Sequence, residues 1–189
     1  MYNPHMTIII GASDLCHTGM GGENLILIKI QGHMGPHFYR VNVTWNKDRQ
    51  GMMCSPELSN NGANDSCIEV ATPPQFPKGI PGIWSPEHMF TAAVSSCFMT
   101  TFLSIAENSK LDFISFNCNS SGKLDQVDGK LQMTEVLLEP VLTIADEKDR
   151  DRAMRVLIKT ESSCLITNSI KAVVTMKPVI LSTVAAEQE

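Results

Sequence analysis

One stretch, beginning at Ser85, constrains the fold more than any other part of the sequence. A serine followed by proline is a strong helix start, because the serine hydroxyl caps the first turn and proline suits its first position. Two neighbouring rows, most of whose members are apolar, then recur at four-residue spacing: Met89, Ala93, Cys97, Thr101 and Ile105, and beside them Phe90, Val94, Phe98 and Phe102. Such a helix is apolar over most of its circumference. We therefore expect it to be the buried centre of the fold.

Strand patterns lie on both sides of this expected helix. Residues 38–45 alternate in the manner of a half-buried strand, residues 46–51 read as a hairpin turn, and residues 52–55 return as a second strand, before a short apolar run at 68–71. Residues 73–86 hold five of the ten prolines and are expected to be a loop. After the helix, residues 113–124 and 130–143 form two strands joined by Asp128-Gly129, a strong hairpin signal.

The last part of the chain adds helices and a closing strand. Asp146 is expected to cap a helix with acidic residues in its first turn and basic residues later, as the helix dipole favours. Ser162-Ser163-Cys164 begins a short helix, and residues 171–181 form a strand. Because strands and helices do not alternate, the sequence predicts an α+β fold. We expect residues 37–189 to be a single domain and residues 1–36 to be an N-terminal extension, to which no role is assigned.

Charge and hydropathy exclude several function classes. The 15 Lys and Arg residues against 20 Asp and Glu residues give a net charge of −5, and no basic block occurs, so a nucleic-acid partner is disfavoured. The longest apolar runs, such as residues 7–10 and 25–30, are far shorter than the ~20 residues of a membrane span. A secretory leader is not expected either, since Asp14 and Glu23 interrupt the first thirty residues and no basic residue precedes Lys29. We expect a cytoplasmic protein that uses neither a membrane nor a nucleic acid.

Six cysteines occur, but their spacing matches neither a disulfide-rich secreted framework nor a zinc ribbon. In a reducing cytoplasm they would be buried small residues or reactive thiols. Cys97 lies among small residues inside the expected helix, and both interpretations remain open for it. Cys164 at a helix start would be a more acidic thiol. Cys54, Cys67 and Cys118 are most simply interpreted as structural or surface thiols.

A zinc site is an alternative use of these side chains. Cys16, His17, His33 and His37 could bind zinc together with Cys54 or Cys67, but no ligand spacing supports such a site. We therefore expect neither a metal nor an organic cofactor.

Residues 84–98, Trp-Ser-Pro-Glu-His-Met-Phe-Thr-Ala-Ala-Val-Ser-Ser-Cys-Phe, resemble the central-helix motif of the OsmC/Ohr family of osmotically inducible and organic hydroperoxide resistance proteins. Residues 48–51, Asp-Arg-Gln-Gly, are similar to the family's early turn with its active-site arginine. Residues 164–169 resemble its second-cysteine helix, with one departure: Leu165 stands where the family usually has proline. The resemblance covers about residues 38–181.

This resemblance implies a fold, an activity and a site. The fold would be an intertwined homodimer, with antiparallel sheets around a long central helix and two active sites at the subunit interface. The activity would be thiol-based reduction of organic hydroperoxides, recycled by a dithiol donor, which in the Ohr branch is a lipoylated protein. By position, Cys97 would be the peroxidatic thiol, Cys164 the resolving thiol, and Arg49 and Glu87 the polar pair around Cys97.

Helix geometry adds an inference about Glu87 and Cys97. Ten residues along one helix correspond to ~15 Å of rise and about 280° of turn, so Glu87 cannot touch Cys97 of its own chain. If both residues serve one site, a second chain must supply one of them.

Two function classes remain. The first is a cysteine-based, metal-free hydroperoxide reductase. The second is a stress-associated or small-molecule-binding protein that keeps the fold and not the activity.

Overall fold

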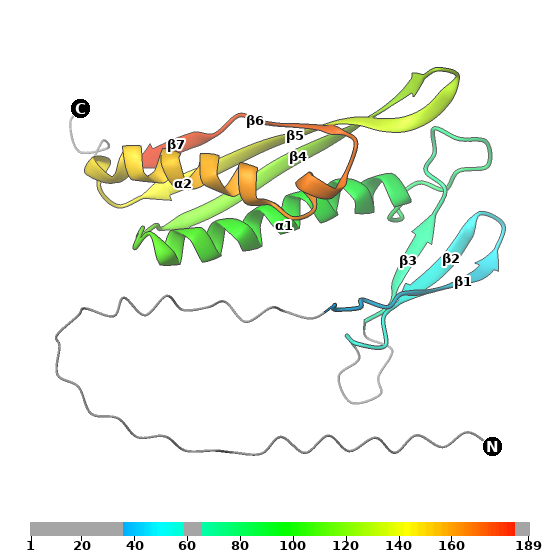
Figure 1. The fold of residues 1–189 in the computed structure, drawn as a ribbon. Coiled ribbons are helices and arrows are strands. Elements are labelled where there is room, and N and C mark those ends of the chain that lie inside the picture. The colour runs from blue at the N-terminus through cyan, green and yellow to red at the C-terminus, as the bar shows by residue number, and fades with distance from the viewer. Residues whose placement is uncertain (1–35, 59–65, 184–189) are drawn as a thin grey trace, which may run out of the picture. The chain divides into compact units, whose positions relative to one another are not determined.

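The structure is a computed structural model in which residues 36–58 and 66–183 are described (Figure 1). By its contacts the chain divides into two units, Met1–Phe38 and Tyr39–Glu189, and every helix and strand described here belongs to the second. The domain boundary expected at residue 37 stays a prediction.

A small antiparallel sheet opens the second unit. Its strands, in the order β1-β2-β3, are β1 (Asn42–Lys47), β2 (Gln50–Cys54) and β3 (Ile68–Ala71). The predicted hairpin between β1 and β2 is confirmed, with a turn at Asp48 and Arg49 in which Asp48 has a positive φ of 44°. The half-buried character predicted for the first strand is wrong for the single chain, because all six residues of β1 are exposed.

The predicted central helix is α1 (Pro86–Asn108). Its cap is confirmed, since the Ser85 hydroxyl accepts a hydrogen bond from the backbone N–H of His88 (3.4 Å). Only one row of α1 is buried, however: Val94, Phe98, Phe102 and Ala106. The neighbouring row with Cys97 is partly open, so the expectation of burial around most of the helix does not hold within one chain. By length and composition alone α1 could cross a membrane, but its buried row packs in the core.

A larger, mixed sheet supports α1. The hairpin of β4 (Ser115–Val127) and β5 (Lys130–Ile144) is confirmed, and its turn residues Asp128 and Gly129 both have positive φ, at 51° and 77°. The strand predicted over 171–181 is two strands, β6 (Val173–Met176) and β7 (Val179–Ser182), both parallel to β5. Pro178 separates them, because proline has no N–H for a ladder bond.

Between β5 and β6 the chain forms η1 (Glu147–Asp149), α2 (Arg150–Ser163) and η2 (Thr167–Ser169). Asp146 caps η1 rather than α2, since its side chain accepts the N–H of Lys148 (3.0 Å). Because β5 and β6 are parallel, they form one strand–helix–strand unit with this segment, so the prediction that strands and helices do not alternate is wrong here.

The core lies where α1 and α2 cover the mixed sheet (Figure 1). Phe102 of α1 stacks on Phe116 of β4, with ring centroids 4.5 Å apart, and Phe98 stacks on the same ring. The predicted α+β fold with a long central helix is confirmed, with a mixed rather than an entirely antiparallel second sheet. This arrangement holds the middle of α1 beside the end of α2.

Candidate active site

The fold brings Cys97 and Cys164 together, although they are 67 residues apart in sequence. Cys97 lies in the middle of α1, and Cys164 directly follows α2; both are free thiols. The backbone N–H of Ile166 donates to the Sγ atom of Cys97 at 3.5 Å, and the Cys164 thiol also hydrogen-bonds to it. We call Cys97, Cys164 and Ile166 the cysteine half-site. Its two thiols interact directly, and each changes the pKa of the other.

The two thiols differ in acidity. Burial is the largest influence on the Cys97 thiol and raises its pKa, but four hydrogen bonds together lower the pKa below the ordinary value. Their donors are the backbone N–H groups of Ile166 and Leu165 and the side chains of Cys164 and Thr101. Cys164 is completely buried, and this burial raises the pKa of its thiol. The thiolate, which is the nucleophile, is therefore favoured at the partly exposed Cys97.

The expected placement of Cys164 at a helix start is wrong. α2 continues through Ser162 and Ser163, and Cys164 ends it in an extended conformation with φ −66° and ψ 117°. The helix terminus next to Cys164 is the carboxyl end of α2, where the dipole carries negative charge and does not stabilise a thiolate. The following turn, η2, begins only at Thr167.

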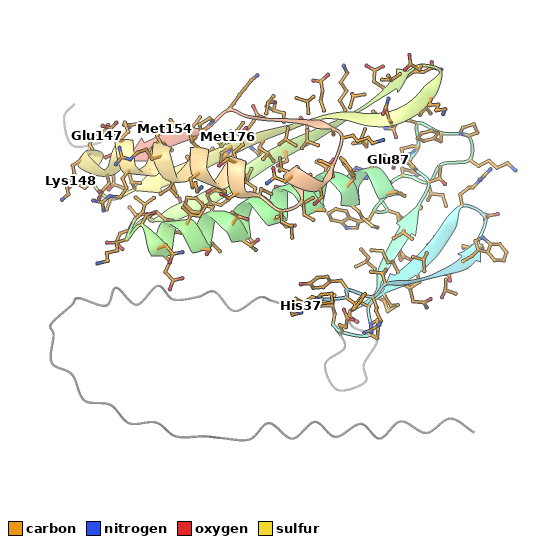
Figure 2. The ribbon with its side chains drawn as sticks, viewed as in Figure 1. His37, Glu87, Glu147, Lys148, Met154 and Met176 are labelled. Carbon is orange, nitrogen blue, oxygen red and sulfur yellow. A yellow bond between two sulfur atoms is a disulfide. The ribbon has the colours of Figure 1, made fainter. Side chains whose placement is uncertain are left out.

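Arg49 and Glu87 line a common groove, which lies elsewhere. Arg49 is exposed in the turn between β1 and β2. Glu87 is in the first turn of α1 (Figure 2). Both line one groove of about 590 Å³, which Cys97 does not line. We call these two residues the arginine half-site. Within the described residues neither side chain forms an ion pair, and Oε2 of Glu87 is buried with no hydrogen-bond partner.

The chain thus assembles two half-sites and keeps them apart. α1 is continuous from Pro86 to Asn108, so ~15 Å of helix rise separates Glu87 from Cys97. An unpaired buried carboxylate oxygen is costly, because it has lost water without gaining a donor. Within the described residues, Oε2 of Glu87 therefore lacks a donor, and Arg49 lines a groove that Cys97 does not line.

Sequence reasoning missed several residues that matter here. The backbone donors of Leu165 and Ile166 have no signature in side-chain identity, so no motif could have revealed them. The disulfide between Cys54 and Cys67 was also missed, and the expectation of free thiols at these positions is wrong. The sequence does contain a signal for this disulfide, because Cys54 and Cys67 flank a turn-rich sequence between two strand patterns.

The zinc alternative gains no support. Cys16, His17 and His33 lie outside the described residues, and Cys54 and Cys67 are bonded to one another. Across residues 36–58 and 66–183, no three His, Cys, Asp or Glu side chains gather in a cluster that could hold a metal.

Comparison with known proteins agrees with this architecture. The sequence model of the family described as OsmC-like protein matches residues 79–178, which include α1, α2 and both cysteines of the cysteine half-site. No curated protein matches the chain in sequence.

Solved structures share the fold over most of the chain. An OsmC-like protein of unknown function from Vibrio cholerae is 24% identical, with a TM-score of 0.65, covering 76% of this chain and all of that one. An organic hydroperoxide resistance protein from Elizabethkingia anophelis is 17% identical (TM-score 0.61; 79% and 99% covered). Another from Legionella pneumophila, described as organic hydroperoxide resistance protein OsmC, is also 17% identical (TM-score 0.60; 78% and 99% covered).

Proposed function

The chain belongs to the OsmC-like protein family, and we propose that it is a cysteine-based peroxidase that reduces organic hydroperoxides to alcohols. One observation carries the proposal: Cys97 has a lowered pKa and lies in contact with a second free thiol, Cys164. Two of the structurally similar proteins are described as organic hydroperoxide resistance proteins, which supports this choice of substrate.

The proposed reaction has two steps at the cysteine half-site. The Cys97 thiolate attacks the distal oxygen of the hydroperoxide, the O–O bond breaks, and the departing alkoxide takes a proton to become the alcohol. Cys97 is then a sulfenic acid. The Cys164 thiol attacks this sulfur and displaces water, so that a disulfide forms and the irreversible acids are avoided. A dithiol donor, such as a lipoyl group, supplies two electrons and two protons to restore both thiols.

Arg49 and Glu87 serve the same reaction in this proposal, from a second copy of the chain. A guanidinium beside Cys97 would stabilise the thiolate and bind the peroxide oxygens, and Glu87 would orient it through paired hydrogen bonds. The unpartnered Oε2 of Glu87 supports this pairing.

Exposed apolar side chains support a homodimer. Met99 and Leu103 on α1 and Val43 and Trp45 on β1 are all at least 40% exposed in the single chain. Apolar side chains gathered on two elements are typical of an interface. In a two-fold dimer each chain gives its arginine half-site to the partner's cysteine half-site, which completes two sites.

The proposed compartment is the cytoplasm. The Cys54–Cys67 disulfide gives this expectation a direct test, because such bonds are rare where glutathione and thioredoxin keep thiols reduced. Acid quenching of cells, followed by alkylation and peptide mapping, measures the state of the two cysteines in place. Free thiols in unstressed cells would support the cytoplasm, where the bond would form only on oxidation, and an intact bond in unstressed cells would argue for an oxidising compartment.

The activity itself is tested by mapping thiols before and after one equivalent of an organic hydroperoxide. Wild-type protein should lose two thiols as a Cys97–Cys164 disulfide, and the Cys97→Ser variant should lose none. If wild type keeps both thiols, the proposed activity is wrong. The alternative of a binding protein would then take its place.

A further inference from the structure

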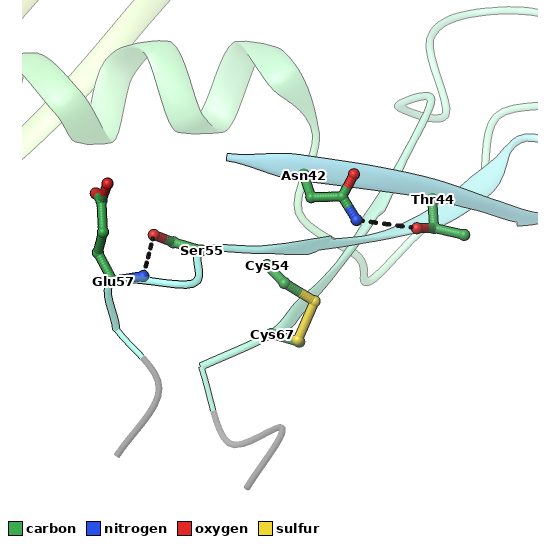
Figure 3. Close-up of a disulfide and its surroundings, with 6 residues drawn as sticks. All are labelled: Asn42, Thr44, Cys54, Ser55, Glu57 and Cys67. Carbon is green, nitrogen blue, oxygen red and sulfur yellow. Dashed lines mark hydrogen bonds between the residues drawn. A yellow bond between two sulfur atoms is a disulfide. The ribbon is translucent and has the colours of Figure 1, made fainter. Parts of the chain in front are cut away.

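Cys54 and Cys67 form a disulfide (Figure 3). It lies outside both half-sites and has no part in the proposed reaction. Cys54 is the last residue of β2, and Cys67 directly precedes β3. The strands pair antiparallel from Gln50 opposite Ala71 to Met53 opposite Ile68, so Cys54 and Cys67 are the next opposed pair. The bond therefore cross-links β2 and β3 in register, at the end of the strand pair where the chain leaves β2 and returns to β3.

The opposite end of the same strand pair carries Arg49. Arg49 directly precedes β2, and its carbonyl accepts a hydrogen bond from the N–H of Thr72, which directly follows β3 (3.0 Å). The strand pair is thus fixed at one end by this hydrogen bond and at the other by the disulfide. The position of Arg49 therefore depends on the pairing register of β2 and β3.

Side-chain packing of β3 contributes little to that register. Of the four residues of β3, only Ala71 is buried, while Ile68 and Glu69 are exposed. Strand register is strongly specified where one face is buried and weakly specified where it is not. β2 is buried or half-buried along its length, so the weakly held partner is β3, a strand of four residues that the cross-link ties to β2.

The register also connects the sheet to α1. The N–H of Ala71 donates to the carbonyl of Trp84 (2.9 Å), one residue before the cap of the helix that carries Glu87. Met53 and Ile68, the pair next to the disulfide, line an apolar groove with Met89 of α1. A slip between β2 and β3 would move Arg49 relative to Glu87.

We infer that the Cys54–Cys67 disulfide is a positioning element that holds Arg49 in the register at which it can serve Cys97. This inference rests on the proposed function, because it gives Arg49 a role in Cys97 chemistry. Reduction of the bond takes two electrons from a dithiol, which becomes a disulfide while Cys54 and Cys67 become thiols. The loosened strand pair then presents Arg49 less accurately, although Arg49 itself is unchanged.

The test is the single-turnover rate at which an organic hydroperoxide oxidises Cys97, with no reductant present. The Cys54→Ser/Cys67→Ser double variant should react about tenfold more slowly than wild type, because misplacement near 1 Å is enough to lose such factors. Cys118→Ser is the matched control, since Cys118 is a free cysteine on β4, and its rate should equal that of wild type.

Combining the double variant with Arg49→Ala separates positioning from general stability. If the disulfide acts through Arg49, breaking it in the Arg49→Ala protein should change the rate by less than about twofold, because the two effects are not independent. If the tenfold loss persists without Arg49, the disulfide acts by another route and the inference is wrong.

A second measurement needs no substitution and covers a failure of the double variant to fold. Wild-type protein is prepared with Cys97 and Cys164 reduced and with the Cys54–Cys67 bond either intact or reduced, as shown by peptide mapping. The reduced form should show the same loss of rate. Equal rates in the two forms overturn the positioning role alone, whereas failure of Cys97 to react in either form overturns the proposed function as well.

Discussion

The cysteine half-site and the arginine half-site are held by different means. Cys97 and Cys164 lie where α1 packs beside α2, next to the fully buried Phe98, so the core fixes their distance. Arg49 lies on a turn of a small sheet whose first strand is wholly exposed, and the sheet is held by hydrogen bonds and one disulfide. The core fixes the position of the proposed nucleophile, whereas the position of the arginine depends on local constraints and, in the proposed dimer, on a second chain.

The largest effect is expected at the cysteine half-site. Cys97→Ser should lower hydroperoxide consumption by about 10⁴-fold or more, because the serine hydroxyl is not ionised and no other thiol replaces the nucleophile. Steady-state turnover with an organic hydroperoxide and a dithiol measures this loss. Cys118→Ser should remain fully active, and equal losses in both variants would place the chemistry elsewhere.

Because the core holds one half-site and an exposed sheet carries the other, we expect substitutions of two aromatic residues to change different properties. Phe102→Ala should lower the free energy of unfolding by ~3–5 kcal/mol, because Phe102 is fully buried between two other phenylalanines. Trp45 is 73% exposed, so Trp45→Ala should leave secondary structure intact and instead weaken the dimer by about tenfold or more. Urea unfolding and sedimentation at several protein concentrations measure the two effects. Unchanged dimerisation in Trp45→Ala would show that no second copy covers β1.

Arg49 should affect rate and not stability. Arg49→Ala is expected to slow Cys97 oxidation by about 10²- to 10³-fold, the range for losing one charged group that stabilises the reacting atoms. Since Arg49 is exposed and forms no ion pair among the described residues of the single chain, the free energy of unfolding of the monomer should change by less than ~0.5 kcal/mol. Arg49→Lys should recover only part of the rate, because lysine cannot form the paired hydrogen bonds. An unchanged rate in Arg49→Ala would remove the arginine half-site from the mechanism.

A smaller effect is expected at Leu165, through its backbone. Leu165→Pro removes an N–H that stabilises the Cys97 thiolate, so the pKa of Cys97 should rise. With less thiolate near neutral pH, alkylation of Cys97 should slow roughly two- to fivefold, the worth of one such hydrogen bond, and the difference should vanish at high pH. The extended backbone of Cys164 tolerates a following proline.

Leu165→Ala is the matched control, because it changes the side chain and keeps the N–H. Its alkylation profile against pH should coincide with that of wild type. A profile for Leu165→Pro that also coincides with wild type would show that this N–H does not stabilise the thiolate.

Much of the fold could be predicted from the sequence, because its signals are local. The Ser85-Pro86 start, the rows of α1 and the Asp128-Gly129 turn each act within a few residues. The parallel pairing of β6 and β7 with β5 could not be predicted, because strands that pair from distant parts of the sequence leave no local pattern. Burial was overestimated for β1 and for the Cys97 row of α1. An apolar face predicts that something packs against it, but the sequence does not identify whether this is the same chain or another molecule.

The site was predicted less completely than the fold. A resemblance of motifs pointed to Cys97, Cys164, Arg49 and Glu87; in the structure the two cysteines interact, and the other two residues line one groove elsewhere. What changes the acidity of Cys97, however, is mostly backbone and tertiary: two N–H groups after α2 and the burial between helices. Cys164 was misplaced because the two serines before it, read as a helix start, continue α2 instead.

The central claim, that each active site is completed by two chains, is tested most directly with a mixed dimer. Cys97→Ser and Arg49→Ala chains carrying different affinity tags are co-expressed, and dimers containing one of each are isolated by two successive purifications. Each parent should be inactive or nearly so. By two-fold symmetry the mixed dimer holds one intact site and one doubly defective site, so it should show about half of wild-type activity. A mixed dimer as inactive as its parents would contradict the account, because the four residues would then have to act within one chain.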